Sequence, residues 1–240
     1  MCTATWLINQ NGYELFFNRD ELKTRLEGIP PKLANAGGVR YISPVDSEAG
    51  GTWIAVNEYG FSACLLNFYA PTIGRKSYAG SVSRGRIIHL VIKSRSTAEA
   101  EERITREDLH RYRPFSLLLF CPGNWPVRLR WRGAGNLGIS RSPSVPQSSS
   151  SFETEKVVES RKRLHTRKYS ASNVSGLLRY HRSHEPIEGP YSVCMHRKDA
   201  ETHSFSHISV TQQRVGFSYT AGSPCSADHR PWIMLQCRVA

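Results

Sequence analysis

The first residues of the chain could supply both a nucleophile and a base from one amino acid. Cys2 follows Met1, and a residue as small as Cys permits removal of an initiator methionine. Cys2 would then carry a thiol together with a free α-amine, which titrates near ~7.7. Such an amine can take the thiol proton at neutral pH, as in N-terminal threonine nucleophiles. We therefore predict that Cys2 performs acyl transfer; the plain alternative is a Cys that follows Met by chance.

A β-hairpin is expected to bring further polar groups to Cys2. Apolar residues at 4–8 and 14–17 flank a turn that ends in Asn11-Gly12, a strong hairpin signal. At the end of the return strand, Arg19 would stabilise a thiolate and Asp20 would hold the α-amine by a hydrogen bond. Neighbouring residues on a strand point to opposite faces, so both reach Cys2 only if the backbone bends there. A charged turn at a strand end is the alternative.

Apolar periodicity divides the rest of the chain into strands, then helices, then strands. Expected strands cover residues 53–56, 61–66, 115–120, 127–131, 192–195, 202–210 and 214–219. Expected helices cover residues 84–93, a short segment capped by Ser96 and Glu99, another beginning near Thr105 and Asp108, and residues 151–167 capped by Ser150 and Glu153. Residues 140–151 and 173–189 are expected to be irregular. This order predicts an α+β fold with antiparallel strands and helices outside.

Three other patterns are interpreted as structural. Residues 133–138 match G-x-G-x-x-G, but Pro143 and Pro146 stand where the helix of a nucleotide site would begin. His203 and His207 share a strand face without a third ligand nearby, so no metal site is predicted. The six cysteines are Cys2, Cys64, Cys121, Cys194, Cys225 and Cys237. They form no C-x-x-C pair, which argues against a zinc ribbon and against a dense disulfide scaffold.

Composition limits the classes of partner. Hydrophobic residues make up 39% of the 240 residues, which suits a domain with its own core. No apolar run is long enough to span a bilayer and no signal peptide opens the chain, so we expect a cytoplasmic protein. The net charge is +12, and residues 128–182 hold twelve Lys and Arg against three Glu. A solvated basic surface is the simplest interpretation; nucleic-acid binding ranks last because no nucleic-acid-binding motif accompanies the charge.

Motifs along the chain resemble the NRDE family, which includes the transport-and-Golgi-organisation proteins. The specific matches are Met1-Cys2, Asn18-Arg19-Asp20-Glu21 and Gly50-Gly51-Thr52-Trp53. Looser matches are Leu66-Asn67-Phe68-Tyr69, Ser83-Arg84-Gly85, Pro114-Phe115, residues 148–151 and residues 219–225. The family is similar to the bile-salt hydrolase and penicillin acylase branch of the N-terminal-nucleophile (Ntn) hydrolases.

The resemblance implies a four-layer α/β/β/α sandwich of two antiparallel sheets, formed by residues 1–240 as a single domain. It implies Cys2 as the nucleophile with Arg19 and Asp20 beside it, and Asn67 as a group that helps to bind the oxyanion. Arg19 and Asn67 should then share one pocket with Cys2. In the acylases the arginine precedes an asparagine and the aspartate comes later, whereas here Arg19 and Asp20 are adjacent. The acylases' second asparagine and late arginine have no evident counterpart.

Two functions follow from the resemblance. The first is a cysteine amidohydrolase that cleaves a non-peptide C–N amide bond of a small, in some cases anionic, molecule without metal or organic cofactor. The second is a non-catalytic binding or trafficking protein for haem, lipid or acyl-CoA-like ligands on the same fold, because a fold does not fix its chemistry.

Overall fold

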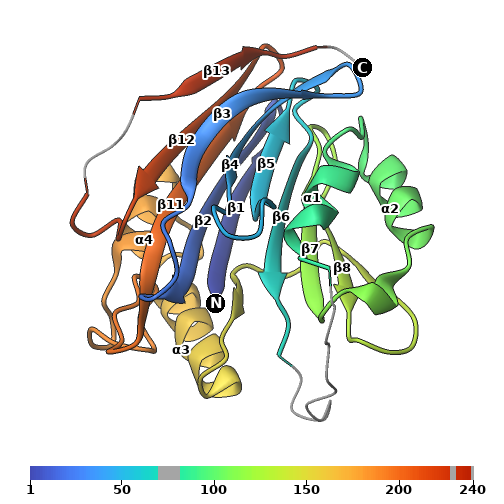
Figure 1. Cartoon of the computed structure of the whole chain (residues 1–240). Helices are drawn as coiled ribbons and strands as arrows, with labels where there is room; N and C mark the ends of the chain where they lie inside the picture. The colour runs from blue at the N-terminus through green and yellow to red at the C-terminus, as the bar shows by residue number, and fades with distance from the viewer. Residues whose placement is uncertain (70–81, 228–230, 239–240) are drawn as a thin grey trace.

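Strands from both ends of the chain meet in one sheet of the computed structural model, which describes residues 1–69, 82–227 and 231–238 (Figure 1). Sheet A has the order β10 (Gln147–Ser149), β1 (Cys2–Asn9), β2 (Gly12–Leu22), β11 (Ala200–Val210), β12 (Arg214–Ala221) and β13 (Ile233–Gln236). Sheet B has the order β3 (Ile29–Ala36), β4 (Val39–Val45), β5 (Ile54–Asn57), β6 (Ser62–Asn67), β7 (Phe115–Phe120), β8 (Val127–Trp131) and β9 (Gly138–Arg141). Neighbouring strands of both sheets pair in antiparallel fashion.

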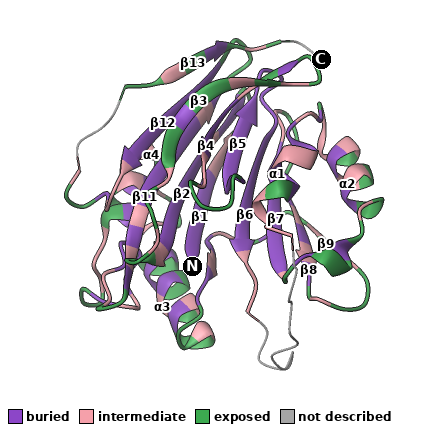
Figure 2. Cartoon of the chain, in the orientation of Figure 1, coloured by how far each residue is buried: buried purple, intermediate pink, exposed green. Residues whose placement is uncertain are grey.

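Alternating side chains place one face of each sheet in a shared core. On β2, Leu15 and Phe17 belong to this core, whereas Phe16 between them packs against α4. On β7, Leu118 belongs to the shared core and Leu117 to the cluster on the opposite side of sheet B. A period of two along each strand thus produces two buried faces per sheet, and Figure 2 shows buried strands throughout the centre of the molecule.

Helices cover the two outer faces. Sheet B packs against α1 (Gly85–Val91) and α2 (Thr97–Thr105), and sheet A against α3 (Thr154–Lys168) and α4 (Val174–Arg182). A short 3-10 helix, η1 (Leu109–Arg111), follows α2. The chain is therefore a four-layer α/β/β/α sandwich, as predicted. No helix among the described residues is both long and apolar enough to cross a bilayer.

The hairpins and the central strands match the sequence predictions, but five expectations were wrong. Residues 140–151 and 173–189, expected to be irregular, include the strand β10, part of β9 and the whole of α4. Residues 192–195, expected to be a strand, form turns and bends. The predicted helix start near Thr105 is instead the end of α2. At the start of α3, Glu153 adopts a left-handed conformation and no side chain caps the helix.

A buried polar contact fixes α4 on sheet A. Asn18 of β2 donates to the carbonyl oxygens of His181 and Val193, at 2.9 and 3.0 Å. The His181 ring contacts Asn18 Oδ1 at 2.9 Å and Thr5 Oγ1 at 2.8 Å. All polar groups of this cluster thus find partners, which a buried amide and imidazole require. The buried Asn18 side chain therefore has a structural role, which is to hold α4 on sheet A.

The same contact predicts a pH-dependent stability. Burial lowers the pKa of His181 well below its usual value. The unfolded chain therefore binds more protons below about pH 6.5, and stability falls as the pH falls. We expect His181→Gln to reduce the slope of unfolding free energy against pH by up to about 1.4 kcal/mol per pH unit below that point. Urea denaturation at several pH values measures the slope; the exposed His110→Gln should leave it unchanged, and equal slopes in all three proteins would contradict the assignment.

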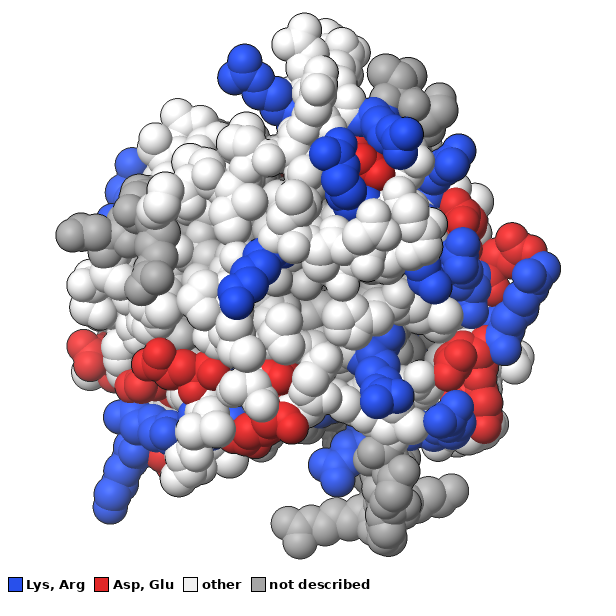
Figure 3. All heavy atoms as spheres, turned by 45° about the horizontal axis from the view of Figure 1, so that its top comes forward, with Lys and Arg blue, Asp and Glu red and all other residues white. Residues whose placement is uncertain are grey.

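The face of the molecule drawn in Figure 3 carries both positive and negative side chains. On the face in Figure 3, Lys and Arg lie beside Asp and Glu. Several ion pairs join residues within one helix, such as Arg103 and Glu99 at 2.7 Å. The sequence placed all the basic residues of α3 on the surface, and this was wrong for Arg161, a basic residue within residues 128–182, where a solvated basic surface was predicted; its side chain is fully buried.

Candidate active site

Cys2 is the first residue of β1, and its side chain belongs to the core between the sheets. Strand β1 lies between β2 and β10, so Cys2 stands opposite Arg19 on one side and Ser149 on the other. Burial raises the pKa of the Cys2 thiol; the amino terminus and Arg19 oppose the rise, and Asp20 adds to it. A thiol with a raised pKa needs a base before it can act as a nucleophile.

Arg19 supplies a fixed positive charge on the same face as Cys2. Its guanidinium lies over the Trp53 ring, 4.4 Å from the centroid, and its Nη2 is 3.2 Å from Asp46 Oδ2. Its Nη1 is buried and has no hydrogen-bond partner among the described residues. A buried donor without a partner is costly unless a ligand satisfies it. Arg19 can therefore stabilise negative charge on sulfur or on a bound molecule.

A cavity of about 260 Å³ brings the predicted site residues together at this end of the sandwich. Cys2, Arg19, Asp20 and Asn67 all line it. The expectation that Arg19 and Asn67 share one pocket with Cys2 is therefore confirmed. The hairpin places the first two, and the end of the neighbouring sheet places Asn67.

Asp20 faces the helix layer, because neighbours on β2 alternate. Its Oδ2 accepts a hydrogen bond from Arg161 Nη1 of α3 at 3.1 Å, and its Oδ1 accepts one from Thr202 Oγ1 at 2.8 Å. Arg161 Nη1 also donates to Thr3 Oγ1 at 2.7 Å. A bulge lies beside this point, where Thr202 pairs with Asp20 but Ser204, two residues on, pairs with Arg19. The Asp20 carboxylate is thus held by Arg161 of α3 and Thr202 of β11. Through Arg161, which also binds Thr3 of β1, these strands are joined to α3.

Met1 lines the cavity and belongs to a small buried apolar cluster. Its amino group donates to the backbone oxygen of Asp20 at 2.8 Å, and its own carbonyl accepts from the Asp20 N–H at 2.8 Å. The side chain is only 8% exposed and packs against Met195 and Ala200, with Ser150 Oγ 3.0 Å from its sulfur. The Asp20 backbone therefore binds the amine of Met1; the predicted bond between the Asp20 side chain and the α-amine of Cys2 concerns the chain without Met1 and stays a prediction.

Asn67 ends β6 and contributes an amide to the cavity. Its Nδ2 donates to Tyr69 Oη at 3.0 Å, and an amide nitrogen carries a second N–H. Asn67 also lines a second cavity of about 260 Å³, whose wall includes Leu66, Phe68 and Val158. One amide thus borders both a charged cavity beside Cys2 and a neighbouring space with apolar walls.

Two glycine-containing motifs form a wall of the charged cavity. Gly51 and Gly85 approach so closely that a Cβ on Gly51 would lie 2.8 Å from the Gly85 Cα. This contact positions Trp53 and Arg84, which line the cavity beside Arg19. Trp53 and Arg84 belong to motifs that resemble the NRDE family, but the sequence predicted no role for them or for Asp46. Their proximity depends on pairing between segments that are distant in sequence.

The close approach predicts a stability defect. Gly51→Ala forces a methyl group against backbone, so we expect a loss of about 1–3 kcal/mol of unfolding free energy. Gly138→Ala is a matched control, because the nearest atom to its added Cβ is 3.6 Å away. Thermal unfolding followed by circular dichroism measures both. An alanine at position 51 that is tolerated as well as one at 138 would contradict the packing described.

Comparisons with known proteins agree with this architecture. The sequence matches the family model described as Transport and Golgi organisation 2 over residues 1–176. A comparison with curated protein sequences gave no match. Among solved structures, penicillin V acylase from Agrobacterium tumefaciens has a similar fold, with a TM-score of 0.55 and 12% identity, covering 92% of this chain and 83% of that one.

Two further solved structures are similar. The Caenorhabditis elegans N-acylethanolamine-hydrolyzing acid amidase ortholog has a TM-score of 0.58 and 12% identity, covering 86% of this chain and 92% of that one. A mutant of conjugated bile acid hydrolase from Clostridium perfringens has a TM-score of 0.56 and 10% identity, covering 98% of this chain and 92% of that one. At these identities the similarity is one of fold.

Proposed function

Because the chain belongs to the Transport and Golgi organisation 2 family, whose model spans residues 1–176, we propose that it is an Ntn hydrolase that cleaves a non-peptide C–N amide bond of a small molecule. One observation carries the proposal. Cys2 opens β1 opposite Arg19 and shares a cavity with Asn67. Residues 1–240 act as one domain in this proposal, since sheet A takes strands from both ends of the chain.

Removal of Met1 creates the catalytic base in this mechanism. The Cys2 α-amine, with a pKa near ~7.7, takes the thiol proton, and the sulfur attacks the amide carbonyl carbon. The carbonyl oxygen becomes an oxyanion, which accepts a hydrogen bond from the Asn67 amide and is stabilised by the positive charge of the Arg19 guanidinium. The protonated amine then gives its proton to the leaving nitrogen. The C–N bond breaks, and a thioester on Cys2 remains.

Water completes the cycle through the same amine. The amine takes a proton from water, the resulting hydroxide attacks the thioester, and the C–S bond breaks. The acid product leaves and the Cys2 thiol regains its proton. Arg19 keeps its position during both steps because Asp46 and the Trp53 ring hold the guanidinium. No further cofactor enters this sequence of steps.

The cavity supports a substrate that carries negative charge near the scissile bond. Four arginines line it, namely Arg19, Arg25, Arg84 and Arg113. The three acids of the lining, Asp20, Glu21 and Asp46, each form an ion pair with an arginine. An apolar portion of the substrate fits the adjoining cavity that shares Asn67. Expected substrates are therefore acyl amides that carry an acidic group near the amide and an apolar acyl chain.

A second function is favoured by the position of Met1. While Met1 remains, the nitrogen of Cys2 is a peptide nitrogen without useful basicity, and Met1 itself lines the cavity next to Cys2. In that form the protein binds an anionic or lipid-like molecule without cleaving it. A native protein that keeps Met1 would therefore favour the binding function, and one that begins at Cys2 would favour the hydrolase.

Reaction with a β-lactam or another electrophilic amide, followed by intact-mass analysis, tests the proposal. The chain that begins at Cys2 is expected to gain one acyl group, and the same chain retaining Met1 is expected to gain none. Peptide mapping should place the group on Cys2. Equal reaction of both forms would contradict the role of the amine, and a Met1-free protein that neither reacts nor turns over any amide in a broad panel would contradict the hydrolase proposal.

A further inference from the structure

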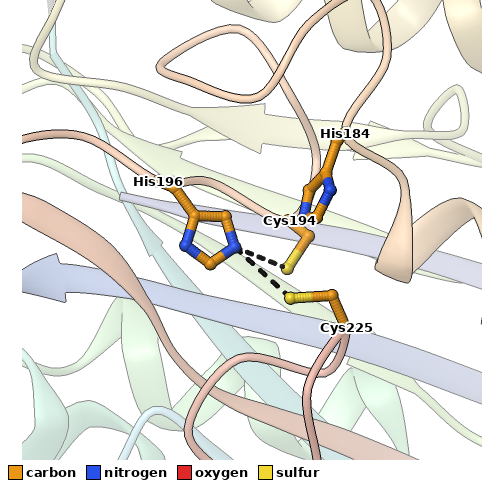
Figure 4. Close-up of side chains that lie close together, drawn as sticks. All are labelled: His184, Cys194, His196 and Cys225. Carbon is orange, nitrogen blue, oxygen red and sulfur yellow. Dashed lines mark hydrogen bonds between the residues drawn. The ribbon is translucent and has the colours of Figure 1, made fainter.

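Four potential metal ligands converge outside the residues that line the candidate active-site cavity. They are His184, Cys194, His196 and Cys225, and their ligand atoms all lie within 4.8 Å of one another (Figure 4). The side chains come from three segments: the end of α4, the stretch before β11, and the loop after β12. Two imidazoles and two thiols form one of the donor sets that zinc prefers in proteins.

The distances match the edges of a zinc tetrahedron. His196 Nε2 is 3.5 Å from Cys194 Sγ and 3.4 Å from Cys225 Sγ. With Zn–S near ~2.3 Å and Zn–N near ~2.0–2.1 Å, a tetrahedral site places sulfur and nitrogen about 3.6 Å apart. In Figure 4 both sulfur atoms point toward the same nitrogen. The three groups therefore already surround a point where a small cation can bind.

His184 has the environment expected of a fourth ligand. Its Nδ1 lies 3.8 Å from Glu188 Oε2. Its Nε2 is buried and has no hydrogen-bond partner among the described residues. Metal-binding histidines commonly direct their second nitrogen to a carboxylate, which orients the ring. The free nitrogen and the nearby Glu188 carboxylate together fit this pattern.

We propose that His184, Cys194, His196 and Cys225 bind one Zn²⁺ in a structural, four-coordinate site. Four protein ligands leave no open position for water or substrate, so the metal supports the fold and takes no part in catalysis. Binding requires both thiols to lose their protons, which are released to solvent. The two S–H bonds are replaced by two Zn–S bonds, and no oxidant or reductant is involved.

The site anchors the segment that supports Asp20 and Met1. The N–H of Met195, next to Cys194, donates to Thr202 Oγ1 at 2.8 Å, and Thr202 in turn donates to Asp20 at 2.8 Å. The Met195 side chain packs against Met1. On the other side, Ser223 Oγ donates to the Thr202 carbonyl at 2.9 Å, two residues before Cys225. Zinc would hold these segments together, since each lacks regular secondary structure.

Metal content and a cobalt spectrum test the site. The untagged full-length protein, dialysed against a mild chelator, is expected to retain one zinc per chain by elemental analysis and native mass. Replacement by Co²⁺ should give the intense visible absorption of a tetrahedral thiolate site. Cys225→Ser is expected to weaken zinc binding more than about 100-fold, because loss of an outer-shell partner alone costs 10- to 100-fold. Cys121→Ser, a matched thiol outside the cluster, should bind zinc as the unaltered protein does.

The outcomes decide the proposal in each case. If Cys225→Ser does not fold, His184→Gln replaces it, and a changed cobalt spectrum with weaker binding supports the site. Adding zinc to the metal-free protein should raise its melting temperature, as for any ligand specific to the folded state. A protein that binds neither zinc nor cobalt, or a Cys225→Ser variant that binds them unchanged, would overturn it. A native Cys194–Cys225 disulfide, seen as the loss of two hydrogens without bound metal, would also overturn it.

Discussion

Cys2→Ala is expected to abolish amide hydrolysis by the Met1-free protein, with a loss of about 10⁴- to 10⁶-fold in kcat as seen when other hydrolases lose their nucleophile. The α-amine, Arg19 and Asn67 remain, but no atom is left to form the thioester. The structure should be retained, because the change removes a single sulfur at the end of β1. Release of a fluorescent amine from an acyl amide measures turnover, and intact mass measures acylation.

Two control variants, Cys121→Ala and Cys2→Ser, make this result specific. Alanine is also small enough to permit Met1 removal, so processing is matched. Cys121→Ala removes a different partly buried thiol and should keep full activity. Cys2→Ser should keep a small residual rate, because the amine persists while the hydroxyl is a weaker nucleophile. Verified hydrolysis by Cys2→Ala at the rate of the unaltered protein would remove Cys2 from the mechanism.

Arg161→Met is expected to cost about 3–5 kcal/mol of unfolding free energy, because it leaves the Asp20 carboxylate buried without its cationic partner. Both side chains are fully buried in the pair, whose atoms are 3.1 Å apart. For a chain of this size that cost corresponds to a fall in melting temperature of roughly 6–20 °C. Differential scanning calorimetry measures the change.

A double substitution separates the missing charge partner from lost packing. Adding Asp20→Asn to Arg161→Met removes the orphaned charge, so the double variant should be more stable than Arg161→Met alone. Lys162→Met, on the exposed side of the same helix, is the control and should change stability by less than about 0.5 kcal/mol. Equal effects at positions 161 and 162 would show that the pair does not carry the stability assigned to it.

The elements with a clear period were predictable from sequence. Strands β7 and β8 match their predicted bounds, because each combines an apolar run or strict alternation with turn residues on both sides. The convergence of Cys2, Arg19 and Asn67 on one cavity was also predicted, although only the resemblance to a known family pointed to Asn67. Strand pairing across the hairpin then sufficed to place Arg19 opposite Cys2.

Other features depend on contacts that no local pattern reveals. Helix α4 is rich in polar residues, and its buried stripe includes His181, which looks like a surface residue until Asn18 is placed beside it. Strand β3 begins with prolines at positions 30 and 31, which weaken any strand prediction, yet an edge position tolerates them. Arg161 lies among five other basic residues and was assigned to the surface with them.

The ligand cluster illustrates the same limit. Cys194 and His196 are two residues apart, a local signal that could have raised the question of a metal. His184 and Cys225 join them only because α4, β11 and β12 meet at one end of sheet A. The wide scatter of cysteines along the chain, interpreted as evidence against a zinc ribbon, therefore says little about their separation in space.

The burial of Met1 has a consequence for when the protein matures. In the proposed mechanism an aminopeptidase has to remove Met1 before β1 is covered, since in the folded chain residues near 20, 150 and 195–200 pack around Met1. At ribosomal rates of about 5–20 residues per second, those last walls emerge roughly 10–40 s after synthesis begins. Processing thus competes with folding on the nascent chain. Chains that fold before processing would keep Met1 buried. The fraction of molecules that begin at Cys2 would then depend on the rate of translation.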